Sequence, residues 1–228
     1  MKADITSILE SSENLKEDLL ALGDEIWQSI DHSDDESLEE GLRVKKAFNE
    51  AVHEFTGSIE QVAEIVDNYS PVKPEPSPEI TTAEDESRVI TELDRHESHS
   101  LDEDFAYKRP YGFRLDGYAV SDVRTWRRLY EHTCKHFAEQ FPEEFRRLPE
   151  SDDFTKSRGN KYFTTSRGNK YFTTKGDQLR TASEIADGIH AETHFSANDI
   201  CARIEELLDY FGIEHDKFRV YLREDRNA

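Results

Sequence analysis

Two short polar stretches in the second half of the chain carry the residues that could bind a phosphate or a base. The first is Arg167–Lys170, a basic turn with a glycine that leads into an expected strand. The second is Thr193–Asn198, which joins an expected strand to a helix that starts at Ser196. A helix start offers free N–H groups to anions, and Thr, Asn, His and Ser side chains can contact phosphates or base edges. Ordinary capping by Ser196 is the alternative, and it needs no ligand.

The basic turn belongs to a perfect tandem repeat of nine residues. Ser157–Thr165 and Ser166–Thr174 are identical, which suggests a recent duplication. The repeat adds Arg158 and Lys161 to the basic residues of the second copy, and it would reinforce any phosphate contact made there. The two copies could pair as a hairpin with Gly168 in the turn. A surface insertion that the fold tolerates explains the repeat equally well.

The residue types that catalysis or metal binding requires are sparse. His132 and His136 stand four apart on an expected helix, a spacing that can hold zinc, but no catalytic Glu follows His132 and no second ligand pair stands out. Cys134 and Cys201 form no paired framework, so a reducing compartment fits. We therefore expect a non-enzymatic protein without a cofactor or metal. A small hydrolase that uses the histidines is a weaker alternative.

Net charge is distributed unevenly along the 228 residues. The total is −21. Residues 1–105 contain 8 Lys and Arg against 29 Asp and Glu, whereas residues 106–228 contain 21 of each. The whole imbalance thus lies in the first half, and the second half can present a basic face if its charges segregate in space. Charge alone does not exclude DNA as its partner.

The first 69 residues predict two long acidic helices. The first helix is expected over residues 3–30, and the second over about 36–69 with Asp34 or Asp35 as its cap. Apolar residues in the second helix alternate in steps of four and three, which is a heptad seam that wants one partner helix. We favour a second chain as the partner, and the alternative is the first helix folded back as a hairpin. The seam residues are Phe48, Val52, Phe55, Ile59, Val62 and Val66.

Residues 70–105 predict a disordered or extended linker. Four prolines lie between Pro71 and Pro78, and acidic and serine residues follow them. A short helix around Ser87 to Asp94 is an alternative for the later part. The sequence shows no signal peptide and no apolar run long enough for a membrane span, so we expect a cytoplasmic protein.

Residues 106–228 predict an α+β domain with a small antiparallel sheet packed on helices. The expected strands are a hairpin over 111–120 with Asp116-Gly117 as its turn, then 170–174, 189–195 and 218–222. A long helix follows a cap at Ser121 or Asp122, with a kink or a new helix at Pro142. The last helix is expected from Ser196 to about Phe211, with Gly212 as its terminator.

Residues 123–212 resemble the DNA-binding domain of SeqA, the bacterial replication-sequestration family. A long helix is followed by Gln140–Phe145, then by Arg167–Phe172, which is similar to that family's basic turn entering a Tyr-Phe strand. The strand through Thr193 comes next, and Cys201–Leu208 is similar to the family's final helix. The order and spacing of these segments carry the resemblance, which covers less than half of the chain.

The resemblance implies binding of hemimethylated GATC duplexes by a protein that multimerises through a separate N-terminal element. The family's basic turn touches the DNA backbone, which corresponds here to Arg167 and Asn169. Its base-reading Thr-Asn-Thr-Asn run corresponds to Thr193–Ser196, where His194 and Ser196 replace both asparagines. We therefore expect a DNA-facing surface with a changed target, in replication control or another DNA transaction at the nucleoid.

These observations predict an oligomeric DNA-binding protein. The alternative is a protein-interaction adaptor whose coiled coil docks a partner and which does not bind DNA. A structure with the basic turn and the 193–198 loop on opposite faces would favour the adaptor. The predicted DNA contacts are Arg158, Lys161, Arg167, Asn169, Lys170, Thr193, His194, Ser196 and Asn198.

Overall fold

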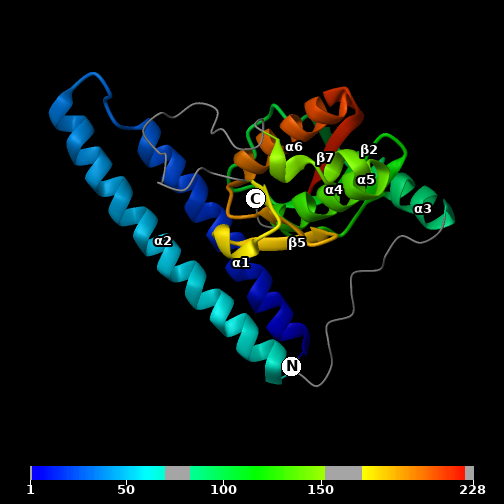
Figure 1. Ribbon diagram of the computed structural model, residues 1–228, viewed down its shortest axis with the longest axis horizontal. Coiled ribbons are helices and arrows are strands. Elements are labelled where there is room, and N and C mark those ends of the chain that lie inside the picture. The colour runs from blue at the N-terminus through cyan, green and yellow to red at the C-terminus, as the bar shows by residue number, and fades with distance from the viewer. Residues whose placement is uncertain (1, 70–82, 152–170, 224–228) are drawn as a thin grey trace.

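The computed structural model describes residues 2–69, 83–151 and 171–223, and it has the predicted α+β architecture. The helices α1 (Lys2–Gln28) and α2 (Asp35–Tyr69) form an antiparallel pair. The remaining described residues form a compact C-terminal domain, and α1 lies between this domain and α2 (Figure 1). Within the described residues, no helix is long and apolar enough to span a membrane.

Close packing joins α1 to α2. The carboxylate of Asp34 accepts a hydrogen bond from Ser37 N at 2.8 Å, as expected for the cap of the second helix. Gly23 allows the Phe48 ring to approach α1, since a Cβ there would lie 3.2 Å from Phe48 Cε1. Val52 is 4% exposed. The seam of α2 therefore packs in part on α1, which is the hairpin alternative, while self-association stays a prediction.

Residues 83–105 belong to the domain, so the predicted linker was too long. The helix α3 (Ala83–Leu93) and the strand β1 (Ser98–His99) fill most of this stretch. Leu93 is fully buried and forms a small cluster with Ala119 and Tyr221. Residues 70–82 are rich in proline and acidic residues, and this composition led to the prediction of a linker. The apolar side chains of residues 83–105 pack against the sheet instead.

The first sheet has four antiparallel strands in the order β1-β7-β2-β3. Strands β2 (Pro110–Leu115) and β3 (Tyr118–Val120) form the predicted hairpin, and β7 (Phe218–Leu222) is the predicted closing strand. The rings of Phe113 and Phe218 stack with centroids 5.1 Å apart. The two ends of the domain thus meet in one sheet.

The second sheet has three antiparallel strands in the order β4-β6-β5. Strands β4 (Phe172–Thr173) and β6 (Ile189–Glu192) match two predicted strands, although both are shorter than expected. The strand β5 (Ala182–Ala186) was missed. It is joined to β6 through Asp187 and Gly188, whose φ values of 50° and 74° suit a tight hairpin turn. This Asp-Gly pair is the sequence feature from which the β5–β6 hairpin could have been predicted.

Three helices complete the core. The helix α4 (Trp126–Gln140) is capped by Thr125, whose side chain accepts from Arg128 N, rather than by Ser121 or Asp122. Pro142 opens the short helix α5 (Pro142–Phe145), as predicted. The helix α6 (Ala197–Phe211) has the predicted cap at Ser196 and ends at Gly212 with φ 68°. Single 3-10 turns lie at Leu148–Glu150, Gly176–Gln178 and His215–Lys217.

Candidate nucleic-acid interface

The two polar stretches attach to neighbouring strands of the second sheet. Arg158, Lys161, Arg167, Asn169 and Lys170 lie outside the described residues, and the chain resumes at Tyr171. Glu192 N donates to Tyr171 O at 2.8 Å, and Phe172 pairs with Ala191. Tyr171 directly follows the basic turn, and Glu192 directly precedes Thr193. The points where the two stretches join the sheet are therefore adjacent.

A buried carboxylate shapes the second stretch, and sequence reasoning missed it. Glu192 accepts hydrogen bonds from the backbone N–H groups of Arg180, Thr181, Thr193 and His194, at 2.7, 3.0, 3.0 and 2.9 Å. Four such bonds fix the backbone of this turn. Thr193 is 1% exposed, and its hydroxyl donates to Thr181 O at 2.9 Å. Thr193 thus holds the turn together and does not face solvent.

His194 is neutral at ordinary pH in this arrangement. Burial, together with the charges of Lys16, Arg180 and His53, lowers the pKa of His194 to about 3. Its Nδ1 is buried and has no hydrogen-bond partner. A neutral imidazole cannot attract phosphate by charge, although it can still donate or accept a hydrogen bond.

Ser196 and Asn198 are both engaged. Ser196 Oγ accepts from Asp199 N at 3.3 Å, which is the capping alternative, and it also donates to Asp24 Oδ2 on α1 at 3.1 Å. Asn198 Oδ1 accepts from Phe105 N at 2.8 Å, and its Nδ2 donates to Asp104 at 2.9 Å. The stretch predicted to read bases is thus occupied by contacts within the chain, one of which comes from the acidic hairpin.

Three arginines of the C-terminal domain hold carboxylates of α1, and none of the three was predicted. Both terminal nitrogens of Arg109 donate to the Asp18 carboxylate, at 2.8 and 2.5 Å. Arg124 Nη1 donates to the two oxygens of Glu10, at 3.2 and 3.0 Å. Arg127 Nη1 lies 3.8 Å from Glu13 Oε2. The paired side chains are between 17% and 45% exposed, so the pairs lie at the edge of the interface.

Glu17 occupies the start of α4. Its Oε1 accepts from Arg127 N at 2.9 Å, while its Oε2 is buried without a hydrogen-bond partner. Burial raises the pKa of Glu17 to about 8; the N–H groups of Arg127 and Trp126 and the nearby charge of Lys16 oppose this rise, whereas Glu13 adds to it. The carboxyl group therefore costs free energy when it is ionised in this place.

Asp24 lies against the start of α6. Burial raises the pKa of Asp24 to about 6, and the charge of Asp199 adds to this rise. Lys45 of α2 and the Ser196 hydroxyl lower it again. The starts of both long helices of the domain thus each face a carboxyl group of α1, which is the chemistry that a helix N-terminus favours.

The periodicity of the acids in α1 could have revealed this contact. Glu10, Glu13, Glu17 and Asp24 are spaced by three, four and seven residues and so lie on one side of the helix. In the sequence these acids are counted only in the net charge of the first half. A carboxylate row at helical spacing is the pattern of a second, charged contact face.

The histidine pair is part of the domain's packing. The ring of His136 stacks on Tyr118 with centroids 4.0 Å apart. Burial lowers the pKa of His132 and of His136. Among the described residues, no group of three or more His, Cys, Asp and Glu side chains is placed to hold a metal ion. Cys134 and Cys201 are buried, and burial raises the pKa of both thiols.

Comparison of the chain with known protein families, with curated proteins and with solved structures gave no match. The resemblance to SeqA therefore rests on the residues of this chain alone, and it stays a prediction.

Proposed function

We propose that this protein binds duplex DNA through its C-terminal domain, in the manner of a SeqA-like protein. One observation carries the proposal: Glu192 N donates a hydrogen bond to Tyr171 O, and these two residues adjoin the two predicted DNA-binding stretches in the sequence. A duplex contacts a protein through several neighbouring groups at once. Attachment points on opposite faces would have favoured the protein-interaction adaptor.

The candidate face also offers the groups that phosphate prefers. The start of α6 lies at Ser196, beside the end of β6, and the start of α4 carries Arg124 and Arg127. Helix N-termini and arginine forks are both used to bind phosphate. These groups would position the backbone of the duplex, and the basic turn would add further contacts to it.

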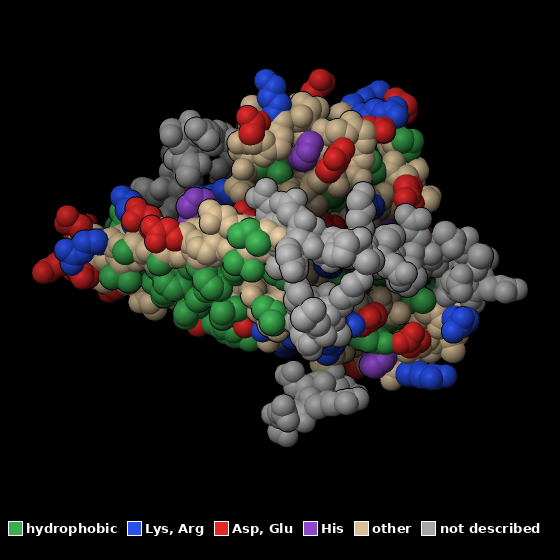
Figure 2. Space-filling model, turned by 90° about the horizontal axis from the view of Figure 1, so that it is seen from below, with side chains coloured by type: hydrophobic (Ala, Val, Ile, Leu, Met, Phe, Trp, Pro, Cys, Tyr) green, Lys and Arg blue, Asp and Glu red, His purple; other side chains and the backbone are tan. Residues whose placement is uncertain are grey.

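We further propose that the protein binds DNA as an oligomer formed through the hairpin. Hydrophobic side chains gather along the hairpin in Figure 2. On α1 the exposed apolar residues recur every seven positions, and α2 exposes others of the same kind, which is the pattern of a helix face that packs on further helices. Two tethered domains would gain affinity on sites within reach of each other. The exposed residues are Ile8, Leu15, Leu22, Val44, Val62 and Ile65.

DNA binding is tested by fluorescence anisotropy with the whole chain. The duplexes carry unmethylated, hemimethylated or fully methylated GATC, or an unrelated sequence, and each is titrated at two salt concentrations. We expect binding whose log–log salt slope is steeper by about 0.9 for each phosphate contacted. The variant Arg167→Ala should weaken it, and the ranking of the duplexes shows whether methylation is read.

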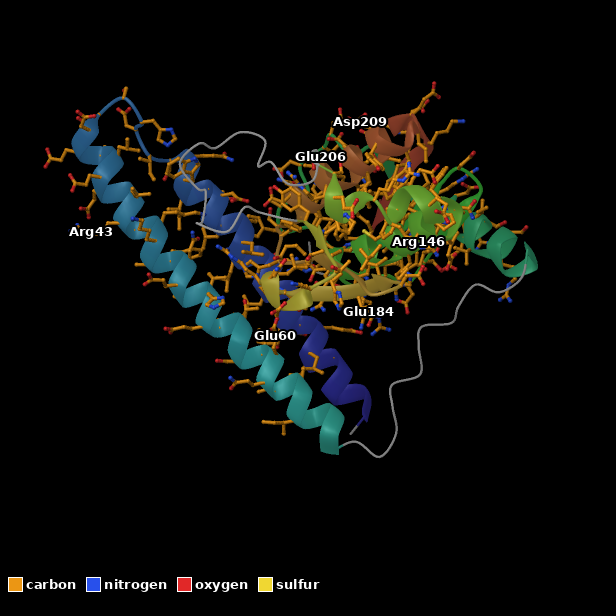
Figure 3. All side chains as sticks on the ribbon, viewed as in Figure 1. Arg43, Glu60, Arg146, Glu184, Glu206 and Asp209 are labelled. Atoms are coloured by element: carbon orange, nitrogen blue, oxygen red, sulfur yellow. The ribbon has the colours of Figure 1, made fainter. Side chains whose placement is uncertain are left out.

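A matched control replaces an arginine that makes its ion pairs elsewhere in the domain. Arg146 pairs with Glu143 and Asp187 near α5, away from the candidate face (Figure 3). Arg146→Ala should leave the affinity unchanged. If no duplex binds at low salt, or if both variants weaken binding equally, the proposal is wrong. The exposed hairpin residues would then direct the search to a protein partner, as the adaptor alternative requires.

A further inference from the structure

The carboxyl groups of α1 cover a continuous line of anion-binding groups on the C-terminal domain. From the start of α1 toward its end, Glu10 meets Arg124, Glu13 and Glu17 meet Arg127, Asp18 meets Arg109, and Asp24 meets Ser196. Residues 10 to 24 of a helix span about 21 Å. The same length of a DNA strand carries about six phosphates. One side of α1 therefore presents carboxyl groups in a row, as a DNA strand presents phosphates.

We propose that α1 is a displaceable acidic cover over the phosphate-binding face of this domain, and that duplex DNA binds to Arg109, Arg124 and Arg127 when the hairpin moves away. This inference rests on the proposed DNA binding and adds its regulation. The guanidinium of Arg109 holds the Asp18 carboxylate with two parallel bonds, a geometry that also suits a phosphate.

Several features make the cover easy to displace. The arginine–carboxylate pairs are partly exposed, and pairs of this kind contribute little and are screened by salt. Glu17 is a buried acid that leaves one oxygen without a partner, and Asp24 is half-buried, which opposes docking. In return, α1 gives Arg109 a carboxylate partner and adds one to Arg124 and Arg127, which also pair with Asp122 and Glu131 of the domain itself.

The contact between α2 and the domain is also slight. Thr181 Oγ1 donates to Glu60 Oε1 at 3.2 Å (Figure 3 labels Glu60), and α2 otherwise packs mainly on α1. The hairpin can therefore move as one unit without losing the packing between its own helices. Residues 70–82 connect it to α3, and they provide the covalent link that keeps the cover close.

The test compares two variants of the whole chain that carry the same change in net charge. The cover variant is Glu10→Gln, Glu13→Gln and Asp18→Asn, which removes the three carboxylates that pair with arginine. The control variant is Glu39→Gln, Glu50→Gln and Glu54→Gln, three exposed positions on α2. Thermal unfolding followed by circular dichroism establishes that each variant is folded, and the single change Asp18→Asn serves as a milder version of the cover variant.

The readout is the affinity for a duplex at fixed salt. A site that is covered most of the time binds in proportion to its free fraction, so we expect the cover variant to bind about tenfold more tightly than the unmodified chain. The control variant should change the affinity by less than about threefold, since exposed charges act weakly at a distance. Adding Arg109→Gln and Arg124→Gln to the cover variant should remove this gain in affinity for the duplex.

The outcomes separate this inference from the proposed function. If the unmodified chain binds DNA and the cover and control variants bind equally well, the face under α1 is not the DNA-binding face and the cover is disproved. If the gain survives the loss of both arginines, the inference is also wrong. If none of the proteins binds any duplex at low salt, the proposed function itself fails, and the cover over a DNA site fails with it.

Discussion

Glu17 is the residue whose ionisation opposes the docked hairpin most strongly. Its pKa is raised to about 8 in the folded chain from an ordinary value of 4.5, so the folded state binds its proton more tightly than the unfolded state does. The stability that this group contributes is present below pH 4.5 and is lost as the pH rises through about 8. Glu13, Lys16 and Arg127 face the group and enter the same balance.

The pH dependence of stability should reveal Glu17. We expect the melting temperature of the chain to fall as the pH rises from about 7 to 8, where folded Glu17 loses its proton. This range lies above pH 6.5, near which His194 ionises in the unfolded chain, and above the pKa of about 6 of Asp24. The variant Glu17→Gln should flatten this fall. Circular dichroism melts at half-unit steps measure it, and an equal fall in both proteins would contradict the account.

Glu192 is the residue that fixes the turn before α6. Its carboxylate accepts four backbone N–H bonds, and bonds to a charged acceptor are among the stronger ones in proteins. We expect Glu192→Ala to lower the free energy of unfolding by about 2–4 kcal/mol, measured by urea titration. Glu184→Ala, on the neighbouring strand β5, removes an exposed carboxylate and should change it by less than about 0.5 kcal/mol. A similar loss of unfolding free energy in the two variants would contradict the structural role given to Glu192.

At the scale of elements, two glycines of α2 give opposite predictions for the same substitution. A Cβ on Gly57 would meet no atom within 4 Å, whereas one on Gly41 would lie 2.5 Å from the Ile30 side chain. Alanine in place of glycine stabilises a helix by about 0.5–1 kcal/mol. We therefore expect Gly57→Ala to raise the melting temperature and Gly41→Ala to lower it, because Ile30 must be displaced. A rise with both variants would contradict the close packing of Ile30, in the turn between α1 and α2, on Gly41.

The elements that sequence patterns predicted are those that carry their own local signals. The hairpin of β2 and β3, the break at Pro142 and the helix from Ser196 to Gly212 each have a turn residue, a proline or a cap that depends only on neighbours in the sequence. The elements that were missed have weak periodicity or depend on distant partners. Strand β5 has weak alternation and is held by β6, while Leu93 is buried by residues more than 25 positions away.

The candidate site was predictable to a smaller degree. The polar stretch at 193–198 was recognised by its residue types, but Thr193 is buried and bonded to Thr181, and Ser196 contacts Asp24 of the docked hairpin. Arg109, Arg124 and Arg127 are scattered among other charges in the sequence, and only the fold brings them under one helix. The basic residues at 158–170 lie outside the described residues, so their role remains a prediction.

At the scale of the whole molecule, the exposed face of the hairpin predicts the oligomeric state. Leu15, 47% exposed on α1, and Val62, 51% exposed on α2, would be buried between two copies. We expect the double variant Leu15→Asp and Val62→Asp to be monomeric by light scattering, since it places charges in that contact, whereas the unmodified chain should be an oligomer. The exposed change Glu54→Gln is the control. A monomeric unmodified chain would contradict self-association.

The central claim that links the hairpin to DNA binding is that DNA takes the place of α1 on the C-terminal domain, and a distance measurement tests this most directly. Spin labels at Ser11→Cys on α1 and Lys135→Cys on α4, both at exposed positions, report their separation by pulsed electron resonance, while the buried Cys134 and Cys201 are protected from labelling. The account predicts one short distance without DNA and a shift to longer distances when a saturating duplex is added. A bound duplex that leaves the distance unchanged would contradict it.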